Sequence, residues 1–176
     1  LYMRNREAYD FQVYHWWNGE VPFVIYPNIT MRDDAAPNGK ALAALLRERR
    51  FRIALSVAID RRRIIDAVYR GIGEPMGLLP EKGTRWYAED LATLHHQHDP
   101  AQANRLLDEL HLTGRDSEGF RTFPDGQRLT LIQSLPPAAD VETAQFIVND
   151  WKAVGLRVLL RPQGRALFQI ERGGRR

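Results

Sequence analysis

Apolar residues in the C-terminal third of the chain change from the alternating spacing of a strand to the spacing of a helix and back again. Leu129 and Leu131 alternate with polar residues, and the segment from Leu156 to Leu160 alternates in the same way. Between them, residues 140–154 carry apolar side chains three and four positions apart, which gives a helix one apolar face. Because a helix and a sheet bury such faces against each other, this order predicts helices packed on strands.

The middle of the chain has a helical pattern. Residues 40–71 carry three successive apolar stripes, which predict three consecutive helices. Asp60 is placed to cap the third of these helices, and Gly71 follows its last turn. Further helices are expected over 99–112, which opens with an aspartate and a proline, and over 165–172.

Two other segments complete the predicted order. Residues 9–30 predict a β-hairpin, because Asn18 and Gly19 separate two runs rich in aromatic and β-branched residues. Residues 72–98 contain several glycines and prolines and little periodicity, which predicts a long ordered loop. The fold class expected from this order is α/β or α+β, with a mixed sheet and flanking helices.

Composition limits the class of protein. The chain has 176 residues, 44% of them hydrophobic, which suits one globular domain. There is no cysteine, so disulfides, thiolate catalysis and cysteine-bound zinc are excluded. No apolar run approaches the roughly 20 residues of a membrane-spanning helix. The first residue is Leu1 and the first methionine is Met3, from which we expect a segment of a longer protein.

Arginines cluster in two places, residues 47–52 and 61–63. Phosphate contacts, and hence a nucleic-acid-binding domain, are one interpretation of such a cluster. The alternative is a solvated helix surface on which the arginines oppose nearby acids such as Glu48 and Asp66. We favour the second, because the net charge is only +3 and no groove-binding motif is present.

The remaining polar residues give little sign of a catalytic or metal site. His95, His96 and His98 lie close together in the sequence. No two of them have the spacing at which a helix presents two metal ligands. Whether they bind a metal therefore stays open, and no metal ligand is assigned. No nucleophile elbow, phosphate loop or dinucleotide motif occurs, and Ser117 and Ser134 have no evident base. We therefore expect no catalytic residues, no cofactor and no enzyme activity.

Aromatic and amide residues gather in the predicted hairpin. With strand alternation, Tyr14 and Trp16 would share one face, and His15 and Trp17 the other. Only one of these pairs is needed to pack the core. The other pair would contact either a ligand or a neighbouring domain. Rings beside amides such as Asn28 suit recognition of peptides or sugars.

A family resemblance covers nearly the whole chain. Residues 50–76, RFRIALSVAIDRRRIIDAVYRGIGEPM, resemble the signature region of the family 5 extracellular solute-binding proteins of ABC transporters. The resemblance continues in Tyr26–Thr30, in Asp99–Leu110 and in Trp151–Val158. It also includes the Pro-Asp-Gly turn of residues 124–126, which precedes the strand predicted at Leu129 and Leu131. Peptide, dipeptide and nickel binders belong to this family.

The resemblance implies a periplasmic-binding-protein type II architecture, in which two lobes close by a hinge around a solute. Residues 1–176 would form a single lobe, and the second lobe would lie elsewhere in the same protein. The partners implied are a small solute (peptide, oligosaccharide or metal chelate) and an ABC permease in the membrane, with no nucleic acid. The implied location is periplasmic or extracellular, with lipid anchoring of the full-length protein left open.

The resemblance also suggests roles for individual residues. Arg52, Asp60 and Arg61 would pack and cap the signature helices. The residues expected to bind the solute are Trp16, Trp17, Asn28 and Arg172. Two other functions remain as alternatives, an arginine-rich nucleic-acid-binding domain and the ligand-sensing domain of a transcriptional regulator.

Overall fold

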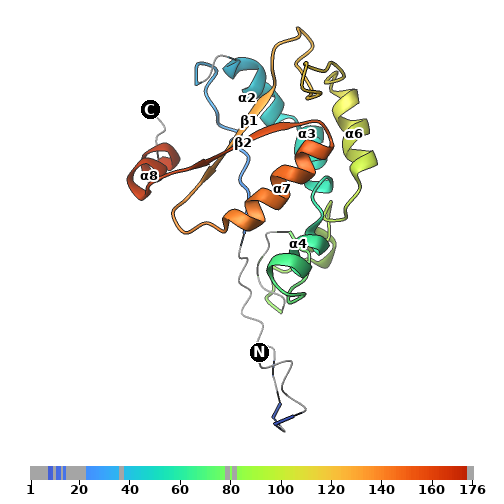
Figure 1. Ribbon diagram of the computed structural model, residues 1–176, viewed down its shortest axis with the longest axis vertical. Helices are drawn as coiled ribbons and strands as arrows, with labels where there is room; N and C mark the ends of the chain where they lie inside the picture. The colour runs from blue at the N-terminus through green and yellow to red at the C-terminus, as the bar shows by residue number, and fades with distance from the viewer. Residues whose placement is uncertain are drawn as a thin grey trace.

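The computed structural model describes residues 8–9, 11–12, 14, 23–35, 38–77, 80 and 83–173, with the backbone alone for 171–173. In this part of the chain a run of helices is followed by a strand, a helix, a second strand and a last helix (Figure 1). The elements are α2 (Gly39–Arg47), α3 (Arg49–Val57), α4 (Arg61–Val68), α5 (Glu89–Ala92), α6 (Pro100–Glu109), β1 (Thr130–Leu135), α7 (Val141–Ala153), β2 (Arg157–Pro162) and α8 (Arg165–Gly173).

Acidic caps fix where the helices begin. The Asp60 carboxylate accepts a hydrogen bond from the Arg63 amide at 3.0 Å, at the start of α4. Asp99 and Asp140 cap α6 and α7 in the same way. Each cap satisfies an amide that has no partner inside its helix. The three helices predicted between 40 and 71 are confirmed as α2, α3 and α4.

The predicted hairpin is not seen in the described residues. Asn18 and Gly19 lie outside them, and the described positions between 9 and 30 form no strand. Pro27 cannot donate to a strand ladder, and Asn28 opens a turn in which its carbonyl accepts from the Met31 amide at 3.3 Å. The expected loop 72–98 contains one short helix, α5.

The two strands pair in parallel, with Thr130 opposite Arg157 at the start of the ladder. Leu131 and Val158 face the core. Among the described residues this two-stranded sheet is the whole of the β structure apart from two isolated bridges. Helices and a sheet in this order confirm the expected α/β class.

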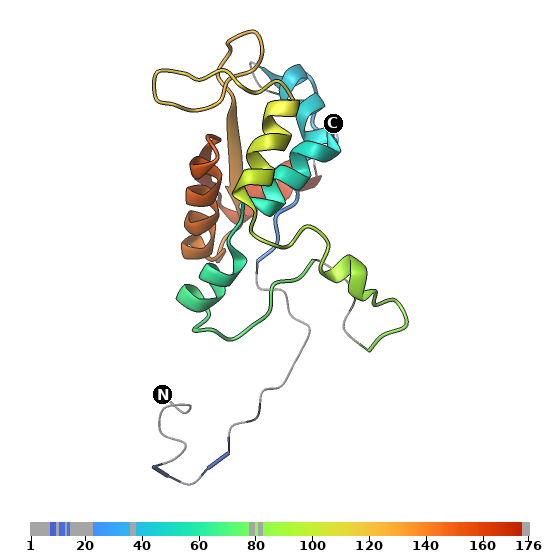
Figure 2. The ribbon, with the colours of Figure 1, turned by 90° about the vertical axis from the view of Figure 1, so that its right-hand side faces the viewer.

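Helix α3 lies at the centre of the core. It packs side by side with α6, which Figures 1 and 2 both show. Phe51 of α3 and Leu107 of α6 are fully buried in this contact region. Trp151 of α7 is 4% exposed, and its indole N–H donates to the Leu55 carbonyl at 2.9 Å. The buried indole therefore has its polar group satisfied while it joins α7 to α3.

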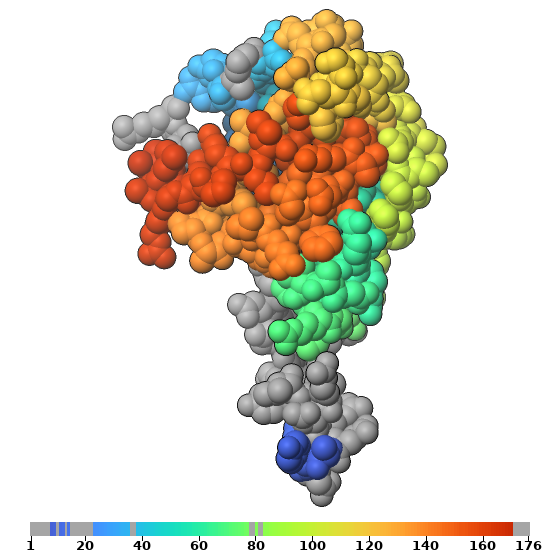
Figure 3. Space-filling model, viewed as in Figure 1, coloured from blue at the N-terminus to red at the C-terminus, as the bar shows by residue number. Residues whose placement is uncertain are grey.

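A buried carboxylate joins α7 to α4. Asp150 is 7% exposed and accepts from the Asp60 amide at 2.9 Å and from the Arg63 guanidinium. Figure 3 shows α4 and α7 forming one continuous face. A buried charge is tolerated only with partners of this kind.

Among the described residues, Arg121 is the largest fully buried side chain, at 1% exposure. Its guanidinium donates to the Leu112 carbonyl at 2.7 Å and the Val154 carbonyl at 2.8 Å. It also reaches two side chains of α6, Asn104 at 2.8 Å and Asp108 at 2.6 Å. One side chain thus holds the C-terminal ends of α6 and α7 together.

We expect Arg121→Ala to lower the free energy of unfolding by about 3 kcal/mol, because it leaves a cavity and removes the donor from two buried carbonyls. Urea unfolding followed by circular dichroism measures this. Arg128→Ala is the control, since that side chain is 59% exposed and surface ion pairs contribute less than about 1 kcal/mol. Equal losses in the two variants would contradict the structural role of Arg121.

Candidate functional site

Asn28 is the one predicted solute-binding residue whose side chain lies in the described part of the chain. It is exposed, and its amide oxygen accepts from the Thr30 amide at 3.2 Å and the Thr30 hydroxyl at 3.1 Å. Arg47 of α2 fixes the same turn by donating to the Ile29 carbonyl at 3.1 Å and the Met31 carbonyl at 2.8 Å. The segment is therefore anchored to α2 while Asn28 faces solvent.

The other predicted solute-binding residues are Trp16, Trp17 and Arg172. Trp16 and Trp17 lie outside the described residues. Arg172 falls within α8, but its side chain is not among those described. These three assignments stay predictions.

Arginines of the two clusters are engaged mainly within the protein. Arg52 donates to the carbonyls of Leu46 and Arg47 at 3.0 and 2.6 Å, at the C-terminal end of α2. Arg61 donates to the Ser56 carbonyl at 2.9 Å, and burial lowers the pKa of its guanidinium. Guanidinium groups bonded to carbonyls are poorly placed to contact phosphates. The packing and capping roles expected for Arg52, Asp60 and Arg61 are confirmed.

The three histidines make separate contacts, one within the loop of residues 72–98 and two with the ends of neighbouring helices. The His95 carbonyl accepts from the Ser56 hydroxyl at 2.8 Å, and the His96 imidazole lies 3.0 Å from the Pro75 carbonyl. His98 lies 3.7 Å from the Asp60 carboxylate. Within the described residues no group of three possible ligands could hold a metal ion.

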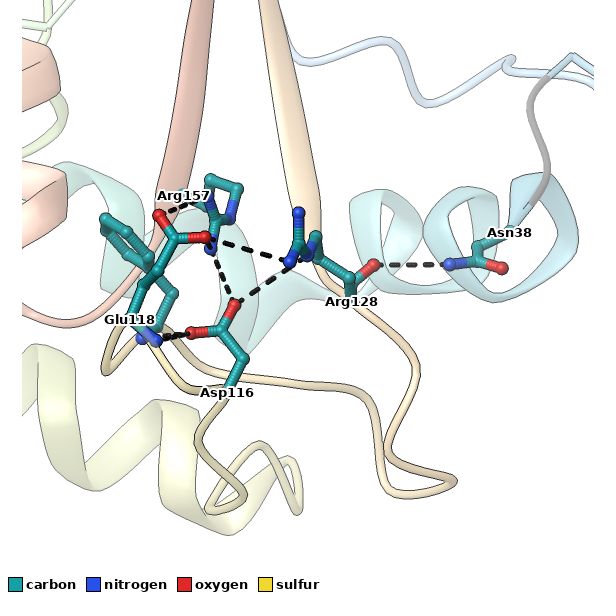
Figure 4. Close-up of polar contacts among 6 residues, drawn as sticks. Asn38, Asp116, Glu118, Arg128 and Arg157 are labelled. Carbon is teal, nitrogen blue, oxygen red and sulfur yellow. Dashed lines mark hydrogen bonds and ion pairs between the residues drawn. The ribbon is translucent and has the colours of Figure 1, made fainter.

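A cluster of charged side chains joins β2 to the loop between α6 and β1 (Figure 4). The sequence pattern did not predict this cluster. Arg157 contacts Asp116 at 2.7 Å and Glu118 at 2.9 Å, and its guanidinium lies over the Phe120 ring at 4.4 Å from the centroid. Arg128 completes the cluster at 3.9 Å from Asp116. The hydrogen bonds from Arg157 hold the pKa of both carboxyls below their usual range. Paired charges of this kind stabilise a loop without offering a free catalytic group.

A shallow hollow adjoins this cluster. Its lining residues are His111, Thr113, Gly114, Arg115, Asp116, Thr122, Phe123, Pro124 and Gly126. None of the predicted site residues lines it, and it is open to solvent. The described residues thus combine a rigid helical scaffold with exposed loops, which is an arrangement suited to binding.

The family comparison decides between the remaining interpretations. The model of the family described as "Bacterial extracellular solute-binding proteins, family 5 Middle" matches residues 8–173. The chain belongs to this family. The resemblance found in the signature region is confirmed, and the nucleic-acid alternative has no support.

Relatives of this family 5 protein bind different solutes. A periplasmic alpha-galactoside-binding protein of Rhizobium meliloti (strain 1021) is 30% identical over 136 residues, covering 72% of this chain and 19% of the relative. The solved oligopeptide-binding protein OppA has 27% identity and a TM-score of 0.71, over 81% of this chain and 23% of its own. A periplasmic oligopeptide-binding protein of Thermotoga maritima, solved with mannohexaose bound, has 26% identity and a TM-score of 0.58, over 69% and 24%.

These structural matches confirm the periplasmic-binding-protein type II fold. The chain spans about a fifth to a quarter of each of these relatives and so corresponds to one part of such a protein. No helix among the described residues has the length and apolar character needed to cross a bilayer.

The Arg157 cluster predicts a pH dependence of stability. Folding lowers the pKa of Asp116 and Glu118. Their contribution to the free energy of unfolding is therefore fully present above the unfolded-state pKa values near 4, and it is lost as the pH falls through the folded-state pKa values. We expect Asp116→Asn to be less stable than the original chain at neutral pH and to lose less stability on acidification. Urea unfolding at about pH 7 and about pH 3 measures both effects.

Asp90→Asn is the matched control, since Asp90 forms no ion pair within the described residues. It should leave the pH profile almost unchanged. An Asp116→Asn profile parallel to that of the original chain would show that the cluster does not couple protonation to folding.

Proposed function

We propose that this chain is one lobe of the solute-binding component of an ABC importer. The match of the family 5 description to residues 8–173 carries the proposal. The component captures a small polar solute between this lobe and a second lobe of the same protein, closes by a hinge motion, and delivers the solute to a membrane permease. It works in the periplasm or outside the cell, and a lipid anchor on the full-length protein would keep it at the membrane.

The proposed solute is an oligosaccharide of the alpha-galactoside type, with a peptide as the second choice. The 30% identical relative is named for alpha-galactosides, and the mannohexaose-bound relative shows that a sugar fits a binder of this fold. Trp16 and Trp17 would supply ring surfaces, and Asn28 and Arg172 would supply hydrogen bonds. No chemical step is needed, so the proposal includes no catalytic residue and no cofactor.

One lobe alone should bind weakly. A complete binder of micromolar affinity gains about −8 kcal/mol, and half of that corresponds to a dissociation constant near 1 mM. We therefore expect the 176-residue chain to show no submillimolar affinity in calorimetry for raffinose, an alpha-galactoside, or for trialanine.

Nuclear magnetic resonance at about 10 mM solute detects binding in this weak range. Shifts with raffinose and not with an equal concentration of glycerol support a sugar-binding lobe. Calorimetric binding tighter than about 0.1 mM would contradict the proposal that the second lobe supplies much of the affinity.

A further inference from the structure

A loop that carries α5, described at residues 75–77, 80 and 83–96, is held at its base and projects from the packed helices. We call these described residues the arm. The Gly77 amide donates to the Ala92 carbonyl at 2.7 Å, and His96 contacts the Pro75 carbonyl. A side chain at Gly77 would place its first carbon 3.3 Å from the Leu91 carbonyl oxygen, so the close approach favours glycine. Figure 2 shows α5 on this arm, away from the packed helices.

Contacts to α3 and α4 fix the base of the arm. Ser56 of α3 donates to the His95 carbonyl at 2.8 Å, and Arg61 of α4 donates to the His96 carbonyl at 3.2 Å. Both contacts belong to the signature region of the chain. Helices α3 and α4 thus fix the position of the arm at its base.

Several large apolar side chains of the arm are exposed. Trp86 is 65% exposed, and Met76, Leu91 and Leu94 are also exposed. Apolar surface of this kind, on a loop with an ordered base, is typical of a binding element.

The Trp86 indole stacks against the guanidinium of its neighbour Arg85. The Arg85 guanidinium carbon lies 4.1 Å from the centre of the indole ring, over its face, in the geometry of a cation–π contact. The neighbouring Tyr87 hydroxyl donates to Glu89 at 2.8 Å. Because Arg85 occupies one face, a flat ligand would stack on the other.

We propose that the face of Trp86 opposite Arg85 stacks on a pyranose ring of the solute. This inference rests on the proposed function and adds a binding residue to it. A galactopyranose ring gathers several C–H groups on one side, and these carry small positive charge that the negative face of an indole attracts. The hydroxyl groups at the ring edge remain directed to polar partners or water.

The indole N–H signals of the four tryptophans provide a direct test in a ¹⁵N-labelled sample of the chain. Methyl α-galactoside at about 10 mM should shift the Trp86 signal. Galactitol, which has the hydroxyl groups without the ring, should not. The Trp151 signal is the internal reference, because that indole is buried and bonded to Leu55.

Variants separate stacking from general loop effects. Trp86→Ala should weaken methyl α-galactoside binding about tenfold, and Trp86→Phe should keep much of it, because a ring remains. Leu94→Ala removes another exposed apolar side chain of the arm and should change the affinity less than twofold.

The remaining outcomes distinguish the inference from the proposed function. If the sugar shifts other signals, such as those of Trp16 and Trp17, and leaves Trp86 unchanged, the stacking site is wrong and the sugar-binding lobe stands. If neither sugar nor trialanine shifts any signal, both are overturned. If trialanine and galactitol shift Trp86 as strongly as the sugar, the pyranose specificity is overturned and the arm is a general contact surface.

Discussion

The buried guanidinium of Arg121 holds the C-terminal ends of α6 and α7 together. It satisfies the last carbonyls after α6 and α7, and the backbone amide of the same residue donates to the Gly155 carbonyl at 2.7 Å. Gly155 has a φ of +84°, which lets the chain turn directly from α7 into β2. The position of β2 beside β1 therefore depends on a side chain that belongs to neither strand.

Arginine serves the same purpose elsewhere in the structure. Arg47, Arg52 and Arg61 all donate to main-chain carbonyls, and a guanidinium can satisfy several such acceptors at once. Other arginines of the signature helices pair with carboxylates, as Arg62 does with Asp66 and Arg63 with Asp150. Arg61 also donates to the His96 carbonyl and so helps to fix the base of the exposed arm that carries Trp86.

Local features were predictable from the sequence and distant contacts were not. The helices of residues 40–71 follow from apolar spacing, and the caps at Asp60 and Asp99 follow from residue type. Arg121 and Asp150 find partners far along the chain, so no local pattern identifies them. For the site, the sequence singled out Trp16 and Trp17, which stay predictions, and it passed over Trp86, because exposure and the stacked Arg85 appear only in three dimensions.

The salt dependence of binding tests most directly the claim that this lobe captures a neutral solute and not a polyanion. Phosphate contacts release counterions, so their affinity falls steeply with salt, whereas stacking and neutral hydrogen bonds change little. We predict that the dissociation constant for raffinose changes less than about twofold between about 50 and 500 mM sodium chloride. Tight binding of a DNA duplex that weakens steeply over the same range, with no binding of raffinose, would contradict the account.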